Sequence, residues 1–233
     1  MMAHSDLNHL TFANFHYSFP REWFSLLKRV VFLDRDGTIN RDSSDYIKSR
    51  EAFEFLPGSL EAIRNLTSNG FVNIVVTNQS AVPRNLISLN ELEFIHTMMA
   101  QMVSRNEGAI KDVFYCPHMP EDDCDCRKPK PGLIQQAREK YEIDLTAAVM
   151  VGDSAEDMEC ARRAGCGRAV LVKSGKDDNV EDVLKSRQLI PDYVAEDLLD
   201  AAKWIIENHS WENAGIIRIS DFIFLYEIIP NEE

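Results

Sequence analysis

The feature that most constrains the fold is an alternation of short β-branched runs with helical patterns through the middle of the chain. Such alternation is typical of parallel strands joined by helical crossovers. The sequence therefore predicts an α/β fold, a Rossmann-like, doubly wound parallel sheet covered by helices on both faces. The predicted strands are 30–33, 72–76, 113–115, 148–151 and 169–172.

Turn and capping residues mark the helices between these strands. Gly70 ends the first helix, and Ser88 with Glu91 forms a capping-box pattern at the start of the second. Pro131 suits the first turn of a third helix, and Gly165 ends a fourth. Because ligands of such sheets bind at the carboxyl ends of the strands, a functional site is expected among the residues just after each strand.

Composition excludes several classes of partner. The chain has 25 Lys and Arg against 38 Asp and Glu, and a net charge of −13 repels nucleic acid and anionic membranes. Its longest apolar runs are five residues, whereas a membrane-spanning helix needs about 20. The first twenty residues carry neither Lys or Arg nor an apolar signal region, so we expect a cytoplasmic protein with reduced cysteines.

The motif Asp34-Arg35-Asp36-Gly37-Thr38 directly follows the first predicted strand. Two carboxylates at positions i and i+2 can point in the same direction, and Gly37 allows the backbone to turn sharply beside them. Such a motif arises by chance in roughly a few chains per thousand of this size. A helix cap or a backbone turn is the alternative role for these aspartates.

Polar motifs follow three other predicted strands. They are Thr77-Asn78-Gln79-Ser80, Arg127-Lys128-Pro129-Lys130-Pro131-Gly132 and Gly152-Asp153-Ser154-Ala155-Glu156-Asp157. Together the motifs offer a nucleophile, an acid and positive charge, which are the needs of phosphoryl transfer. In order and spacing across residues 30–175, the four motifs resemble those of the haloacid dehalogenase superfamily of aspartate-nucleophile phosphatases.

Phosphoryl transfer gives each catalytic residue a role. We expect Asp34 to attack phosphorus and form an aspartyl phosphate, which splits hydrolysis into two easier steps. Asp36 would protonate the leaving oxygen and then deprotonate water, and crowding by Asp34 and Asp153 should favour its neutral form. Thr77 and Lys128 would hold the phosphoryl oxygens, where one preorganised donor is typically worth about 3–4 kcal/mol of barrier.

Three acidic positions that repel one another also require a divalent cation, and hard oxygen ligands suit Mg²⁺. We expect its ligands to be Asp34, the main-chain carbonyl of Asp36, and Asp153. Asp157 has two possible roles: an outer position around the metal, or a place in the first turn of a helix, where carboxylates are favoured.

A second cluster combines three cysteines and a histidine within eleven residues, namely Cys116, His118, Cys124 and Cys126. The spacing predicts a closed Cys₃His zinc site that is structural, because no position is left for water. Unmetallated cysteines that cluster by chance are the alternative. The cluster ends just before Arg127 and Lys128, so a fixed loop would also fix both cations. We expect Cys160 and Cys166 to be core residues and His96 to lie on a helix face.

The zinc loop joined to 127–132, together with the first two motifs, resembles the D,D-heptose 1,7-bisphosphate phosphatases, with histidinol-phosphatase domains as near relatives. The resemblance implies a Mg²⁺-dependent phosphatase that removes the C7 phosphate of D-glycero-D-manno-heptose 1,7-bisphosphate, in the synthesis of nucleotide-activated heptose. It implies substrate contacts by Asp42, Ser43, Ser44, Asn78, Gln79, Ser80, Arg127 and Ser154.

The chain departs from this family's pattern at two places. Residues 81–85 lack two glycines, which changes the available backbone angles. Ser154 stands where some relatives carry Lys, which removes one contact to a second phosphate. Histidinol phosphate therefore remains an alternative substrate.

The positions of the motifs and of the predicted strands and helices indicate three parts of the chain. These are an N-terminal extension (1–29), a phosphatase domain (30–208) with the zinc loop at 116–126, and a C-terminal extension (209–233). Asp36 and Pro57 are 21 residues apart, and Gln79 and Arg127 are 48 apart, so neither usual insertion point has room for a cap domain. We expect a capless monomer that acts on a small sugar phosphate, with the apolar extensions packed against the domain.

Two more distant functions are alternatives. A DNA 3′-phosphatase would share the first motif but would need a basic groove, which the net charge of −13 argues against. A non-catalytic zinc module that only binds partners would not need Asp34, Asp36 and Lys128 to be present together.

Overall fold

A six-stranded parallel sheet forms the centre of the computed structural model, which describes residues 7–12, 15–20, 29–177 and 179–209. Every neighbouring pair of strands in this sheet is parallel, as the alternating pattern predicted. In spatial order the strands are β5 (Ile110–Cys116), β4 (Val72–Asn78), β3 (Val30–Leu33), β6 (Val149–Gly152), β7 (Arg168–Val172) and β8 (Tyr193–Ala195).

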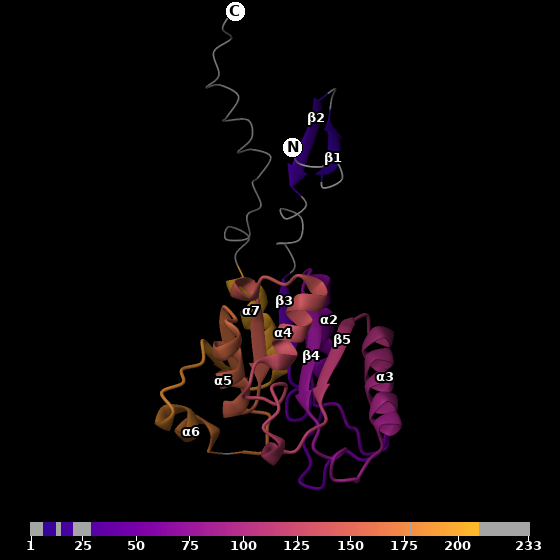
Figure 1. Cartoon of the computed structure of the whole chain (residues 1–233), viewed down its shortest axis with the longest axis vertical. Coiled ribbons are helices and arrows are strands. Elements are labelled where there is room, and N and C mark those ends of the chain that lie inside the picture. Colours follow the sequence, from indigo (N-terminus) through magenta and orange to yellow (C-terminus); the bar gives the residue numbers. More distant parts are fainter. Residues whose placement is uncertain (1–6, 13–14, 21–28, 178, 210–233) are drawn as a thin grey trace, which may run out of the picture.

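Helices cover both faces of the sheet (Figure 1). One apolar core lies beneath α2 (Ser59–Ser68), α3 (Leu89–Arg105) and α7 (Leu198–Asn208). The other core lies beneath α4 (Gly132–Tyr141), α5 (Ala155–Ala164) and α6 (Val180–Ser186). The predicted doubly wound α/β fold is confirmed.

The central strand β3 shows why the sequence folds in this way. All four of its residues are buried, with Val31 and Leu33 in one core and Val30 and Phe32 in the other. A continuous apolar run is what a strand covered on both faces requires. Because β3 pairs with β4 and β6, the residue that follows it, Asp34, emerges in the middle of the carboxyl edge.

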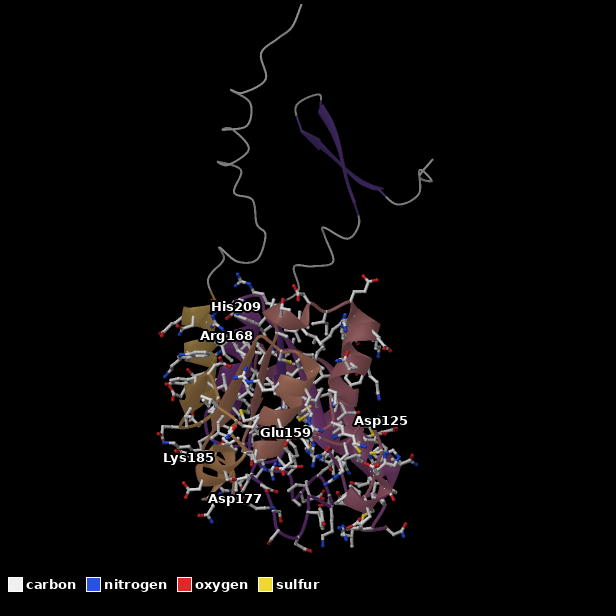
Figure 2. The ribbon with its side chains drawn as sticks, turned by 60° about the vertical axis from the view of Figure 1, so that its left-hand side comes forward. Asp125, Glu159, Arg168, Asp177, Lys185 and His209 are labelled. Carbon is white, nitrogen blue, oxygen red and sulfur yellow. The ribbon has the colours of Figure 1, made fainter. Side chains whose placement is uncertain are left out.

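The carboxyl ends of the strands gather at one end of the molecule. In Figure 1 the arrowheads of the sheet point to the lower end, where the connecting loops meet. Figure 2 shows Asp177, shortly after β7, at that lower end, whereas Arg168 at the start of β7 and His209 after α7 lie at the upper end. This polarity brings the residues that follow different strands to one edge.

Several elements were not predicted. Strand β8 has three residues, too few to show a period, and α7 begins after an Asp197 side chain that accepts from Asp200 N. Strands β1 (Leu7–Phe12) and β2 (Phe15–Pro20) form a separate antiparallel pair where no regular element was expected. The apolar stretch 216–229 lies outside the described residues. Among the helices that the structure describes, none is long and apolar enough to cross a membrane.

Candidate active site

A cavity of about 770 Å³ lies where β3, β4 and β6 end. Every residue that the sequence assigned to catalysis, substrate contact or Mg²⁺ lines it: Asp34, Asp36, Asp42, Ser43, Ser44, Thr77, Asn78, Gln79, Ser80, Arg127, Lys128, Asp153 and Ser154. Additional cations line it as well, namely Arg84, Lys130, Arg163 and Lys176. They supply the local positive charge that an anionic ligand needs on an acidic protein.

Lys128 is buried beside the cavity with all three ammonium protons in use. Its Nζ lies 2.6 Å from Asp34 Oδ1, 2.6 Å from Asp157 Oδ1 and 3.0 Å from the carbonyl oxygen of Val76. Burial alone would lower the pKa of Lys128, but the two carboxylates raise it above its ordinary value. Asp34 lines the cavity, whereas Asp157 is fully buried. Of the two carboxylates that hold Lys128, Asp34 is therefore the one on the cavity side.

Asp34 and Asp153 have the electrostatics of a cation site. Burial raises the pKa of Asp34 to about 7, with Lys128 opposing the shift and Asp157 adding to it. Burial, the charge of Asp34 and the charge of Asp157 raise the pKa of Asp153 to about 9. One ligand atom from each of the three carboxylates lies within 4.8 Å of the others. A cation beside them would restore the ionised forms, and oxygen donors of this kind suit Mg²⁺.

Two glycines enclose the Asp153 carboxylate. Gly37 adopts φ 82°, and a Cβ built there would lie 2.4 Å from Asp153 Oδ2. A Cβ on Gly175 would lie 2.2 Å from the same oxygen. Ser174 Oγ donates to the carbonyl of Gly37 at 2.7 Å and joins the two segments. The carboxylate thus occupies a cradle that only glycine leaves open.

Asp157 lies in the first turn of α5, where a carboxylate was one of the two expectations for it. Ser154 caps this helix, and Asp157 Oδ2 accepts from the Ser154 main-chain N at 3.1 Å and from its Oγ at 2.6 Å. The other oxygen accepts from Lys128. Both oxygens therefore have donors, so Asp157 serves as helix cap and counter-ion. One of its oxygens also lies within 4.8 Å of ligand atoms of Asp34 and Asp153, which is compatible with an outer position around a metal.

The environment of Asp36 differs from the sequence expectation. Arg35 donates to both of its oxygens, from Nη2 at 2.9 Å, and Asn40 and Gln79 donate at 2.8 Å and 2.9 Å. Burial would raise the pKa of Asp36, but Arg35 and these hydrogen bonds outweigh it and hold the pKa below its ordinary value. The expectation of a neutral Asp36 is therefore wrong for this structure, because donors from Arg35, Asn40 and Gln79 favour the carboxylate.

Asn78 and Gln79, at the end of β4, form hydrogen bonds that hold other residues of the site in place. Asn78 exchanges hydrogen bonds with the main chain of Lys128, from Nδ2 to the carbonyl at 3.1 Å and from the Lys128 N to Oδ1 at 3.0 Å. Gln79 Nε2 donates to Thr77 Oγ1 at 3.0 Å as well as to Asp36. Asn78 and Gln79 line the cavity, but their amides are engaged with the protein.

The four predicted zinc ligands come together next to this cavity. Cys126 Sγ lies 3.2 Å from Cys116 Sγ and 3.5 Å from Cys124 Sγ, and His118 Nδ1 lies 3.2 Å from Cys126 Sγ. A tetrahedral site with Zn–S bonds of about 2.3 Å has sulfur–sulfur distances of about 3.8 Å, close to these. The donor set therefore fits Zn²⁺, and none of these cysteines is in a disulfide.

The zinc loop is tied directly to the residues that follow it. Arg127 Nη1 donates to the His118 carbonyl at 3.2 Å and to Ser80 Oγ at 2.9 Å. Gly132 N donates to the Asp125 carbonyl at 3.1 Å, and a Cβ on this glycine would lie 2.3 Å from the same oxygen. The loop and the segment 127–132 are thus packed in direct contact.

Sequence reasoning missed Lys176 among the residues that line the cavity. Lys176 follows β7 and pairs with Asp42 at 2.7 Å, so a fifth strand end contributes to the cavity. The available signal was its position just after the strand predicted at 169–172. Asn85, in the segment that lacks the family's glycines, adopts φ 56°, a left-handed conformation that asparagine tolerates. His96 lies in helix α3, as expected, on its buried face, and its contact with Arg35 is what the sequence did not indicate.

Comparison with known proteins finds relatives over this same region. The "HAD-hyrolase-like" family model matches residues 125–201. D-glycero-beta-D-manno-heptose-1,7-bisphosphate 7-phosphatase from Pseudomonas aeruginosa is 45% identical over 149 residues, which span 64% of this chain and 83% of that protein. The protein of the same name from Escherichia coli (strain K12) is 40% identical over 154 residues, which span 63% of this chain and 80% of that protein.

A solved structure agrees with these matches. The crystal structure of D,D-heptose 1,7-bisphosphate phosphatase from B. bronchiseptica, complexed with magnesium and phosphate, aligns with a TM-score of 0.71 and 37% identity. The alignment covers 77% of this chain and 98% of that chain.

Proposed function

Because this chain belongs to the haloacid dehalogenase-like phosphatases, in the family of the heptose 1,7-bisphosphate 7-phosphatases, we propose that it removes the C7 phosphate of D-glycero-D-manno-heptose 1,7-bisphosphate. The observation that carries the proposal is the meeting of Asp34, Asp36, Asp153 and Lys128 in one cavity, from three separate segments of the chain. A nucleophile, a proton carrier and a buried cation in contact are what phosphoryl transfer requires.

The proposed reaction has two steps. An oxygen of Asp34 attacks phosphorus and the bond between phosphorus and the sugar oxygen breaks. Asp36, a carboxylate in the free enzyme, would first take a proton from the bound phosphate monoanion and then give it to that sugar oxygen. A water molecule then gives a proton to Asp36 and attacks phosphorus, and the bond from phosphorus to Asp34 breaks to release phosphate. Asp36 in the described structure is in its base form, the form that the second step uses.

The proposed Mg²⁺ ligands are Asp34, the main-chain carbonyl of Asp36, and Asp153. The ion would offset the charges of these carboxylates and of the phosphoryl oxygens. Lys128 adds a positive charge that the protein itself supplies, and Asp157 holds that charge in place.

We also propose the bounds of the phosphatase domain, the absence of a cap over the site, and the oligomeric state and location of the enzyme. The phosphatase domain spans 30–208, and segments 37–58 and 79–88, which form turns and isolated bridges, leave the site capless. The enzyme would act as a monomer in the cytoplasm, where reduced cysteines can hold a metal.

A phosphate-release panel tests the substrate. Full-length enzyme with Mg²⁺ is expected to release phosphate from heptose 1,7-bisphosphate with a higher kcat/KM than from histidinol phosphate, and both anomers of the bisphosphate are compared. If histidinol phosphate is hydrolysed at least as efficiently, the alternative substrate is correct. Release of one phosphate per bisphosphate, rather than two, checks that only one ester is cleaved.

For the cluster of Cys116, His118, Cys124 and Cys126 we propose one structural Zn²⁺. Cys124→Ser is expected to lower zinc content and to reduce kcat/KM about 10–100-fold, because the loop holds Arg127 in place. Elemental analysis and kinetics on the same preparation measure both effects. Cys166→Ser, a buried cysteine outside the cluster, is the matched control and should keep its zinc. A Cys124→Ser enzyme that loses zinc but keeps wild-type kinetics would show that the loop only stabilises the fold.

Arg127 is expected to act on substrate binding more than on chemistry. The planar guanidinium of Arg127 can donate two parallel hydrogen bonds to a second anionic group. Arg127 lies between Ser80 and the zinc loop at the cavity. Arg127→Ala should raise KM for the bisphosphate about tenfold and leave kcat for a monophosphate nearly unchanged. Equal effects on a bisphosphate and on histidinol phosphate would contradict this role.

A further inference from the structure

Arg35 is a buried cation whose side chain is held from two directions. It is 1% exposed, although it carries a charge. Nε and Nη2 donate to Asp36 at 3.1 Å and 2.9 Å, while Nη1 lies 3.0 Å from His96 Nε2. A guanidinium has donors only, so His96 must accept through Nε2 and carry its proton on Nδ1. The pair of contacts fixes the plane of the guanidinium.

His96 is well placed to serve as this acceptor. It is buried in α3, a 17-residue helix, and its ring packs against Tyr115 with 5.5 Å between ring centroids. Burial, together with the charge of Arg35, lowers the pKa of His96 to about 3. A neutral imidazole can accept from Arg35, whereas a protonated one would repel it.

We propose that His96 is a positioning residue, which anchors the Arg35 guanidinium and through it sets the direction of the Asp36 carboxylate. Arg35 holds both oxygens of Asp36, so a rotation of the guanidinium would turn the carboxylate with it. Gln79 and Asn40 constrain the carboxylate from other sides, but neither contacts the far end of Arg35. This role depends on the proton-transfer function proposed above for Asp36.

The dependence of the rate on the leaving group distinguishes two roles of His96: positioning of Asp36, or packing of α3 alone. Alkyl phosphates such as heptose 1,7-bisphosphate and histidinol phosphate need a proton on the leaving oxygen, whereas p-nitrophenyl phosphate scarcely does. His96→Leu removes the acceptor. His96→Gln keeps an acceptor oxygen in a similar place. Met99→Leu, also buried in α3, is the control for repacking of the helix.

His96→Leu is expected to lower kcat/KM, which reports formation of the aspartyl phosphate, about tenfold on both alkyl phosphates, with kcat/KM on the aryl phosphate changed less than about twofold. His96→Gln should recover at least about half of the lost rate, and Met99→Leu should match wild type on all three substrates. If the leucine variant does not fold, His96→Asn, whose amide is too short to reach Arg35, replaces it with the same expected pattern.

Three results would overturn the proposal: equal losses on alkyl and aryl phosphates, wild-type kinetics in His96→Leu, or no recovery in His96→Gln. Asp36→Asn is measured in parallel as the reference. A selective loss in Asp36→Asn with a uniform loss in His96→Leu would overturn the role of His96 alone. A uniform loss of kcat/KM in Asp36→Asn would instead overturn proton transfer by Asp36 to the leaving group, and the role of His96 with it.

Discussion

Asp34→Asn is expected to reduce turnover at least about 10⁴-fold on every phosphate ester while the protein stays folded. An amide is not a nucleophile, so the first step has no attacking group. The fold should survive because Lys128 keeps Asp157 as a partner and because one of several crowded carboxylates loses its charge. Phosphate release and thermal unfolding of the Mg²⁺-loaded protein measure the two effects.

The matched control is Asp182→Asn, which removes an exposed carboxylate from α6. It should leave both activity and melting temperature unchanged. Residual activity of Asp34→Asn above about a hundredth of wild type would argue against covalent catalysis by this residue.

Lys128→Met is expected to damage both catalysis and stability. The substitution leaves Asp34 and Asp157 buried without a counter-ion, which typically costs about 3–5 kcal/mol in the free energy of unfolding. It also removes positive charge from the phosphoryl site, and kcat should fall about 10²–10³-fold. Lys140→Met, which removes an exposed ion pair with Asp112, should change neither quantity appreciably.

A double variant separates the two effects of Lys128→Met. Adding Asp157→Asn removes one of the unpaired charges, so the free energy of unfolding should recover in part while kcat stays low. Denaturant unfolding and steady-state kinetics are the measurements. Recovery of activity in the double variant would mean that Lys128 acts on the reaction only by keeping the protein folded.

The sheet and the position of the site could be predicted from the sequence because both follow from local patterns. Short apolar runs define strands that are buried on both faces, and parallel strands end at the same edge. Asp34 and Lys128 are 94 positions apart in the chain. The rule brings the strands that precede them to one edge, and the zinc loop after β5 leads the chain on to Lys128. The cysteine and histidine spacing is similarly local, and the four ligands do meet.

The protonation state of Asp36 and the surroundings of His96 could not be predicted, because both depend on which side chains contact one another in the folded protein. No local pattern shows that Arg35, rather than Asp34 and Asp153, would dominate the surroundings of Asp36. His96 reads as an ordinary helix residue until α3 is packed beside β5 and Tyr115. Arg35 is the chain neighbour of Asp36, but whether its guanidinium turns onto that carboxylate depends on the folded structure, in which His96 contacts it from 61 positions away. The energies of such contacts decide protonation states that composition leaves open.

The central position of β3 also sets the order in which a growing chain can become active. This strand is the first of the parallel sheet to be synthesised, but its neighbours are residues 72–78 and 149–152. Asp34 therefore leaves the ribosome well before Lys128 and Asp157, the residues that accompany it into the interior. An unfinished chain must keep Asp34 in water, so translation itself delays the appearance of a nucleophile until the domain is nearly complete.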